Sequence, residues 1–315
     1  MKKKQPLVCI VIVNWNGGEK VLECVSSLIA KTDYKNYKIL VVDNGSTDGS
    51  PEKIGKNFEK IKIIRTGKNL GFTKGTNFGW NYCLKKYKPE YICDMNNDIV
   101  TVQKDWLSLM VNSLEKNEGA GICGNKLIFP DGRLQLLYLE RDRPDYNEKD
   151  HGQYDFIKKV QAVGGANMLI KVSMVKKIGG RDENFFYGPD DIDYCLRARN
   201  AGFEIIYNGF SKSIHIGSFS YLSSNKDRIY LEQSYGQMVF AFRHGKLLEK
   251  IKMSLNQFAR IFITRKDPFN KKHLNNLHFH LSFPKRFIYF LRALFNAIIS
   301  HNNIKNDYLK KLNIE

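Results

Sequence analysis

The alternation of buried strand and helix signals over the first hundred residues constrains the fold more than any other feature. Two β-branched runs, Val8–Val13 and Ile39–Val42, are apolar without interruption, as strands buried on both faces of a parallel sheet are. Amphipathic helical patterns separate these runs from further strand signals at Ile61–Ile64 and Tyr91–Cys93. Strands that alternate with helices at this spacing predict βαβ units. We therefore expect an α/β fold with a mostly parallel sheet flanked by helices.

Polar residues follow the ends of these predicted strands. In open α/β sheets, ligands bind beyond the carboxyl ends of the strands. The sequence therefore predicts a polar ligand site at one edge of the sheet, built from four short clusters: Asn14–Asn16, Asp43–Ser46, Gly67–Asn69 and Asn96–Asp98.

The second half of the chain is less regular. The polar, proline-containing segment from Leu134 to Tyr154 predicts a mobile loop. A strand is expected over Ala162–Ile170 and a short helix over Val172–Ile178. A second helix is expected over Asp190–Ala201, where Gly202 stands in the usual position just after a helix end.

Positive charge is concentrated towards the end of the chain. The 315 residues carry a formal net charge of +18, and residues 226–315 contain 17 Lys and Arg against 6 Asp and Glu. We expect this part to be a basic, mainly helical extension of a domain formed by residues 1–225. Both anionic membranes and nucleic acids attract such an excess of charge, and composition alone favours neither.

Several features bear on location. The apolar run at Leu7–Val13 ends at Asn14 without a cleavage signal, so we interpret it as a first strand. The six cysteines contain no C-x-x-C pair, which suits free thiols in a reducing compartment.

The segment 285–295 mixes large apolar and cationic residues and is too short to span a bilayer. It predicts either a helix on an anionic membrane surface or a helix packed on the domain. We expect a cytoplasmic protein that associates peripherally with the inner face of the cell membrane.

An ordered set of motifs resembles family-2 glycosyltransferases of GT-A fold, in their rhamnosyltransferase-like branch. The set comprises Val41–Gly49, Asn69–Asn77, Asn96–Asp98, Phe186–Arg197, and His215 ahead of Gly217 and Ser218. The resemblance implies a metal-dependent, inverting transfer of a sugar from a UDP or dTDP donor to a hydroxyl acceptor, in cell-surface polysaccharide or glycoconjugate synthesis. It also implies that residues of about 6–100 bind the nucleotide and residues 101–225 the acceptor.

The resemblance assigns the nucleotide to the strand-end clusters. A carboxylate at Asp43 can accept a hydrogen bond from the imide N–H of uracil or thymine. The alternative is that Asp43 forms an Asx-turn that merely ends the strand. The predicted nucleotide-binding residues are Asn14, Asn16, Asp43, Asn44, Ser46, Asn69, Gly71, Asn77, Asn96 and Asn97.

Asp98 and His215 are the predicted metal ligands. A divalent cation can neutralise the charge that develops on a diphosphate leaving group, and a hard carboxylate ligand suits Mn²⁺ or Mg²⁺. Position 96 is Asn, where a strict Asp-x-Asp motif would add a second charge. Asp94 lies nearby. The alternatives are a turn that closes the strand and a histidine of the core.

Three carboxylates, Asp190, Asp191 and Asp193, crowd the start of one predicted helix. Crowding raises the pKa of at least one of them, which suits a general base for an acceptor hydroxyl. The resemblance implies Asp191 as the base, with Asp190 second, and Asp193 as a residue that orients the acceptor or caps the helix. The alternative is stabilisation of the helix dipole. Gly165 and Asn167 are expected under the donor sugar and acceptor, or in a strand bulge.

Two other functions compete with this one. A nucleotidylyltransferase on a related fold needs a basic phosphate loop after the first strand, which the Asn14–Gly18 segment lacks. A non-catalytic lipid- or nucleic-acid-binding protein is supported by charge alone, and the chain contains no recognised nucleic-acid module. We expect no nucleic-acid partner. The sequence indicates neither the donor sugar nor the acceptor.

Overall fold

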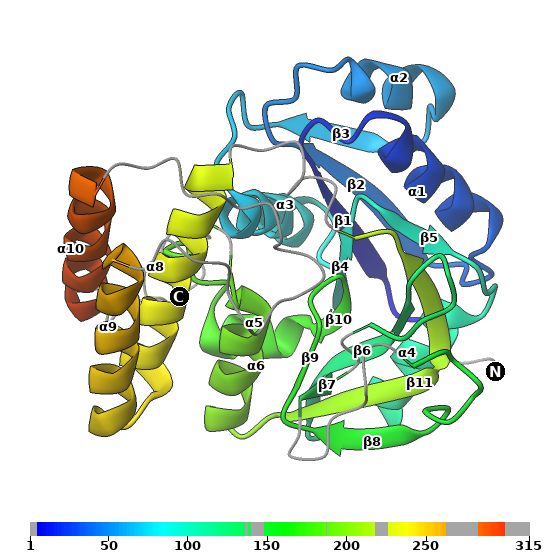
Figure 1. The fold of residues 1–315 in the computed structure, drawn as a ribbon. Coiled ribbons are helices and arrows are strands. Elements are labelled where there is room, and N and C mark those ends of the chain that lie inside the picture. The colour runs from blue at the N-terminus through cyan, green and yellow to red at the C-terminus, as the bar shows by residue number, and fades with distance from the viewer. Residues whose placement is uncertain are drawn as a thin grey trace. The chain divides into compact units, whose positions relative to one another are not determined.

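The computed structural model describes residues 5–135, 138–139, 148–186, 188–217, 226–262 and 283–299. The described residues fall into two compact units (Figure 1). The first, here the sheet unit, contains the residues up to 182 together with those of 191–217. The second, the helical unit, contains those of 183–190 and the helices after residue 225. The short stretch before Asp191 thus belongs with the helices that follow residue 225.

The sheet unit is organised around a nine-stranded sheet with the order β3-β2-β1-β4-β10-β6-β11-β5, in which β8 pairs with β11. A separate pair, β7 (Tyr138–Leu139) with β9 (Ala162–Val163), lies outside it. The nine strands are β1 (Val8–Asn14), β2 (Tyr37–Asp43), β3 (Lys62–Arg65), β4 (Tyr91–Asn96), β5 (Ile99–Thr101), β6 (Ala120–Ile128), β8 (Ile157–Val160), β10 (Asn167–Lys171) and β11 (Glu204–His215).

The two halves of the sheet differ in strand direction. Strands β3, β2, β1 and β4 run parallel to one another, as the alternating pattern predicts. In the second half β10 is antiparallel to both β4 and β6, and β11 is parallel to β6 but antiparallel to β5 and β8. The reversal at β10 brings its first residue, rather than its last, to the edge where β4 ends.

Helices cover both faces of the sheet (Figure 1). One face packs against α1 (Gly18–Ala30), α2 (Ser50–Asn57) and α4 (Trp106–Lys116). The other packs against α3 (Phe72–Lys86), α5 (Val172–Ile178) and α6 (Asp190–Asn200). Each layer buries an apolar cluster, and the stabilisation scales with the apolar area removed from water.

Two sequence expectations need correction. The strand expected over Ala162–Ile170 is interrupted, because residues 164–166 leave the ladder and the chain moves from β9 to β10. The mobile loop expected from Leu134 is ordered at its start: Leu134 is fully buried and bridges to Ile128. Residues 136–137 and 140–147 of that loop lie outside the described residues.

The helical unit consists of α8 (Lys226–His244), α9 (Leu247–Phe262) and α10 (Phe283–Ile299). Its own small core is formed by Phe185, Met238, Val239, Ala293 and Ala297. Pro284 is the second residue of α10, within its first turn. In the described part of the chain, no helix has both the length and the apolarity that crossing a bilayer demands.

Candidate active site

Residues from separate strands converge at one edge of the sheet. Asn14 pairs with Asp43 across β1 and β2, and Val13 pairs with Asn96 across β1 and β4. From the other half, Asn167 lies opposite Met95. His215 lies opposite Ile99, three residues beyond the end of β4. The strand topology therefore assembles the polar clusters that the sequence predicted.

Asn14 connects three of these clusters. Its fully buried amide donates to Ser46 Oγ at 3.2 Å and to Ser50 Oγ at 2.9 Å. Its Oδ1 accepts from Asn97 Nδ2 at 3.0 Å. Asn16 also contacts Ser46: its backbone N–H donates to Ser46 Oγ at 3.1 Å. These predicted nucleotide-binding residues are thus fixed by one another.

Asp43 forms the Asx-turn that was considered as the alternative role for it. The side chain is 4% exposed, and its Oδ1 accepts from the Ser46 N–H at 2.9 Å, which is the Asx-turn alternative. No described residue donates to its Oδ2. A turn and a free acceptor oxygen therefore coexist in one carboxylate, and base recognition stays a prediction.

Asn44 joins the loop after β2 to the loop before α3. Its Nδ2 donates to the Gly71 carbonyl at 3.1 Å and to Asn69 Oδ1 at 3.3 Å, and its Oδ1 accepts from the Leu70 N–H. Gly45 has a φ of +81°, and a Cβ there would lie 2.6 Å from the Lys68 backbone, so this approach requires glycine. These contacts show how Asn44, Asn69 and Gly71 hold the two loops together. Their role in binding a nucleotide stays a prediction.

Asn77 lies in a buried polar cluster with Arg181. Its amide donates to the Arg181 carbonyl at 2.8 Å and accepts from the Arg181 N–H at 2.9 Å. The Arg181 guanidinium pairs with Asp94 at 2.8 Å, and Trp80 Nε1 also donates to Asp94. Burial raises the pKa of Asp94, while the Arg181 charge opposes that rise. Asp94 is therefore part of the packed core rather than of the strand-end site.

Asp98 and His215 face each other at the end of β4. The distance from Asp98 Oδ1 to His215 Nε2 is 3.2 Å, and Asp98 Oδ2 accepts from the Gly217 N–H at 3.0 Å. Asn96 Nδ2 is also 3.2 Å from His215 Nε2. Burial acts to raise the pKa of Asp98, but the His215 ring and the Gly217 N–H outweigh it and lower the pKa. The two predicted metal ligands are thus side by side, and His215 is not a residue of the apolar core.

This pair fits a divalent cation as part of its ligand set. A carboxylate oxygen and an imidazole nitrogen are both ligands for Mn²⁺, and the carboxylate suits Mg²⁺. Within the described ranges, no group of three or more His, Cys, Asp or Glu side chains could hold a metal. An ion at Asp98 would therefore need further oxygen ligands, which a diphosphate and water can supply.

Asp191 lies at the start of α6 against the β9–β10 connection. Its Oδ2 accepts from the Gly165 N–H at 2.8 Å, and its Oδ1 accepts from the Ile192 N–H at 2.8 Å. A Cβ on residue 165 would lie 2.8 Å from the Asp191 Cβ. The glycine thus permits the close approach that holds this carboxylate.

The other residues predicted around Asp191 have different surroundings. Asp193 is fully buried and pairs with Arg197 at 2.9 Å, one helical turn away. Asn167 is also fully buried, where it donates to Ser213 Oγ at 3.2 Å and accepts from the Cys93 thiol. Asp190 is 7% exposed and belongs to the helical unit. The structure brings Gly165 to Asp191, and it gives Asp193 and Asn167 partners within the packed interior.

Sequence reasoning missed Gln135 and Arg181. Gln135 contacts His215 through both atoms of its amide, but it occurs in a stretch whose composition predicts a loop. Arg181 follows a pair of glycines and carries no motif. No sequence signal identifies either residue, because long-range contacts define both.

Comparison with known proteins identifies the family of this chain. The profile of glycosyl transferase family 2 matches residues 9–179. The dTDP-rhamnosyl transferase RfbF of Shigella flexneri is 27% identical over 195 residues, which cover 61% of this chain and 63% of that protein. The chain spans less of other curated relatives, between 18 and 37% of the length of three of them.

Two solved structures share the fold. GalNAc-T7, solved with UDP, GalNAc and Mn²⁺, has a TM-score of 0.62 at 14% identity, over 95% of this chain and 58% of that one. The mannosyltransferase PcManGT of Pyrobaculum calidifontis, solved with GDP-Man and Mn²⁺, has a TM-score of 0.53 at 14% identity, over 98% and 79%. The chain therefore belongs to glycosyl transferase family 2 and has the GT-A fold that its sequence motifs predicted.

Proposed function

We propose that this protein transfers a sugar from a UDP- or dTDP-sugar to a hydroxyl group of a glycan or lipid-linked acceptor, with inversion at the anomeric carbon. The observation that carries the proposal is the Asp98–His215 pair at the sheet edge. A bound Mn²⁺ or Mg²⁺ would supply charge neutralisation of the diphosphate leaving group there. Asp98 and His215 would hold that cation, with Asn96 donating to the same cluster.

The proposed base is Asp191, with Asp190 as the second candidate. Inversion in one displacement needs a group that accepts the proton of the acceptor hydroxyl as it attacks. Both oxygens of Asp191 already accept one backbone N–H each, and each keeps a second lone pair. These contacts orient the carboxylate, and its acceptor capacity remains for a hydroxyl proton.

The donor proposal rests on Asp43, whose Oδ2 accepts from no described residue. A uracil or thymine imide N–H would donate to that oxygen. RfbF is named as a dTDP-rhamnosyl transferase, and GalNAc-T7 was solved with UDP, whereas PcManGT was solved with GDP-Man. Calorimetry with UDP, dTDP, GDP and CDP, each with and without Mn²⁺, tests the proposal. We expect UDP or dTDP to bind most tightly and only weakly without metal; a preference for GDP would remove the role of Asp43.

The mechanism is tested with Asp191→Asn, which keeps size and polarity but removes the basicity. We expect kcat to fall roughly 10²–10⁴-fold, the usual contribution of a general base, with donor affinity nearly unchanged because the loss falls in the transition state. NMR of the product must show the opposite anomeric configuration to the donor. A retained configuration rules out the mechanism. Release of pyrophosphate would instead indicate a nucleotidylyltransferase.

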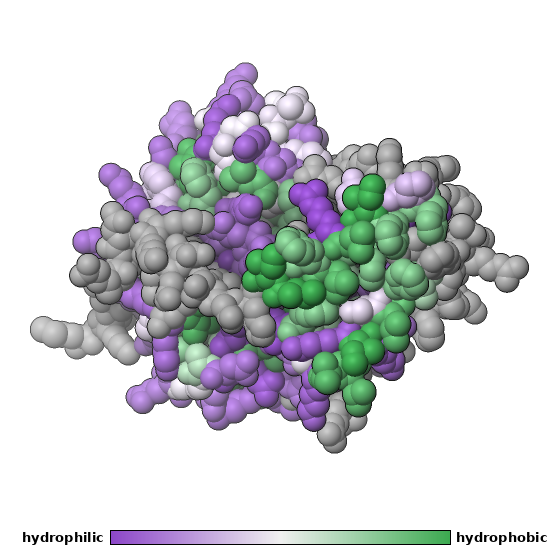
Figure 2. Space-filling model, turned by 90° about the vertical axis from the view of Figure 1, so that its left-hand side faces the viewer, coloured by the Kyte–Doolittle hydropathy of each residue, from purple (hydrophilic) through white to green (hydrophobic). Residues whose placement is uncertain are grey.

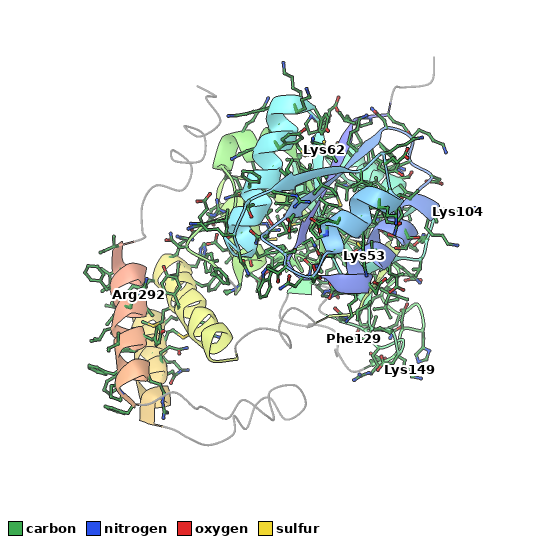
Figure 3. All side chains as sticks on the ribbon, turned by 90° about the horizontal axis from the view of Figure 1, so that it is seen from above. Lys53, Lys62, Lys104, Phe129, Lys149 and Arg292 are labelled. Atoms are coloured by element: carbon green, nitrogen blue, oxygen red, sulfur yellow. The ribbon has the colours of Figure 1, made fainter. Side chains whose placement is uncertain are left out.

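We also propose that the helical unit binds an anionic membrane surface on the cytoplasmic face. Of the 18 large apolar side chains that are exposed among the described residues, 13 lie on α9 and α10, and Figure 2 shows the broad apolar area. On α9, Leu247, Ile251, Leu255 and Phe258 recur at helical spacing, with exposures of 39–73%. Arg292 projects from α10 (Figure 3). An apolar face with flanking cations is the pattern of an interfacial helix.

Vesicle sedimentation tests the membrane proposal. Leu255→Glu removes an apolar group that is 61% exposed, and Phe210→Glu, at 46% exposure on the sheet unit, is the matched control. We expect wild type and the control to sediment with phosphatidylserine vesicles, with binding that weakens as salt screens the charges. Leu255→Glu should lower the bound fraction. If sedimentation did not depend on salt, or if the protein did not sediment with the vesicles, the apolar face of α9 and α10 would more reasonably be a surface that packs on protein.

A further inference from the structure

Gln135 holds the predicted metal ligand His215 at two points. Its Nε2 donates to the His215 carbonyl at 2.6 Å, and its Oε1 lies 2.7 Å from His215 Nδ1. The residue is 8% exposed, and its backbone N–H donates to the Leu127 carbonyl at 3.0 Å. The backbone of Gln135 is therefore anchored to the end of β6, and its side chain extends from there to the His215 ring.

These contacts determine which ring nitrogen carries the hydrogen. A backbone carbonyl only accepts, so the amide NH₂ of Gln135 must face the His215 carbonyl. The amide oxygen then faces Nδ1, and because that oxygen also only accepts, Nδ1 must be the protonated nitrogen. In the neutral ring, Nε2 keeps its lone pair.

The Nε2 lone pair faces Asp98. Asp98 Oδ1 is 3.2 Å from Nε2, and two acceptors at that distance repel unless a positive charge lies between or beside them. The amide of Asn96 donates to the same region from 3.2 Å. The space between His215 Nε2 and Asp98 Oδ1 therefore suits either a proton or a metal cation that takes the place of the proton.

From this geometry we infer that Gln135 is a positioning residue, which fixes His215 as the Nδ1–H tautomer so that Nε2 is available to the cation held by Asp98. The inference rests on the proposed metal role of Asp98 and His215. Partners of this kind, one shell beyond the ligands, set the orientation and tautomer of a histidine, and their loss costs about 10–100-fold in metal affinity.

The tautomer is measured on the metal-free protein by ¹⁵N NMR of labelled histidines at about pH 8.5, where an ordinary imidazole is neutral. The chain has seven histidines, and the spectrum of His215→Asn identifies the signal of His215. We expect wild type to show protonated Nδ1. Gln135→Leu should lose this preference, whereas Gln135→Glu, whose carboxylate still accepts from Nδ1, should keep it.

Mn²⁺ affinity in the presence of UDP gives the second measurement. We expect roughly 10–100-fold weaker binding for Gln135→Leu, and a value close to wild type for Gln153→Leu, an exposed glutamine of the same loop. An Nε2–H tautomer in wild type, or unchanged tautomer and affinity in Gln135→Leu, would overturn the inference. Absence of Mn²⁺ binding by wild type with a normal Nδ1–H tautomer would instead overturn the proposed metal role.

Discussion

Asp94 and Asp98 are four residues apart at the end of one strand, but their surroundings differ. Asp94 is buried against the Arg181 guanidinium at 2.8 Å, with Trp80 as a further donor. Asp98 faces a histidine and a backbone N–H, and no Lys or Arg pairs with it among the described residues. The Asp94 carboxylate is neutralised by a guanidinium within the core, whereas Asp98 has no such partner among the described Lys and Arg residues and keeps capacity for an exchangeable cation. The partner of an acidic residue therefore says more about its role than its position in a motif.

The largest expected effect comes from breaking the Asp94–Arg181 pair. Arg181→Leu leaves a buried carboxylate without its cation, which typically costs about 3–5 kcal/mol of folding stability. Urea unfolding measures the loss. The double variant Asp94→Leu/Arg181→Leu should recover much of it, because no charge then remains buried. Equal losses in the single and double variants would contradict the account of Asp94 as half of an ion pair.

Asp98→Ala should show the opposite behaviour, with the fold kept and turnover lost. We expect turnover with metal to fall roughly 10²–10³-fold, equivalent to the several kcal/mol that a Lewis acid supplies. Steady-state kinetics over a Mn²⁺ titration measures the effect, and circular dichroism checks the fold. A folded variant with a normal metal response would exclude Asp98 as a ligand, and an unfolded variant would support a structural turn.

The two carboxylates should also differ in how pH affects stability. The pKa of Asp98 is lowered in the folded protein, so its contribution is present above the unfolded value of about 3.9 and is lost as pH falls through the lower folded value. Asp94, with a raised pKa, acts in the opposite direction. We expect metal-free Asp98→Asn to be about 1.5 kcal/mol less stable than wild type at neutral pH. That gap should close below about pH 4; a gap that persists there would contradict the assignment.

Gly165→Ala extends the comparison to a third carboxylate, Asp191, whose partners are backbone N–H groups. The added Cβ would lie 2.8 Å from the Asp191 Cβ, so the carboxylate must shift. We expect about a 10-fold lower kcat, since small misplacements of a reacting group are costly. Gly119→Ala is the matched control, because its new Cβ meets nothing closer than 3.6 Å. Equal activity of the two variants would show that the position of Asp191 is not critical.

The sequence predicted the parallel half of the sheet well, because uninterrupted β-branched runs and amphipathic helices are local patterns. The helix over Val172–Ile178 was predicted with the boundaries that the structure has. The break between β9 and β10 was not predicted, because strand pairing, rather than composition, decides where a ladder ends. In the site, the pairing of Asp98 with His215 was expected from resemblance. The contacts of Gln135 and Arg181 were not, since each depends on a residue far away in the chain.

The membership of Phe185 in the core of the helical unit has a consequence for locating the proposed activity within the chain. Phe185 is fully buried with Met238, Val239, Ala293 and Ala297, and only five residues separate it from Asp191. Deleting the chain after residue 225 would strip the cover from this phenylalanine and release the stretch that leads into the proposed base. A fragment that is to carry the proposed activity should therefore extend beyond residues 9–179, which the family profile matches. Loss of activity in a shortened protein would not demonstrate a failure to reach a membrane.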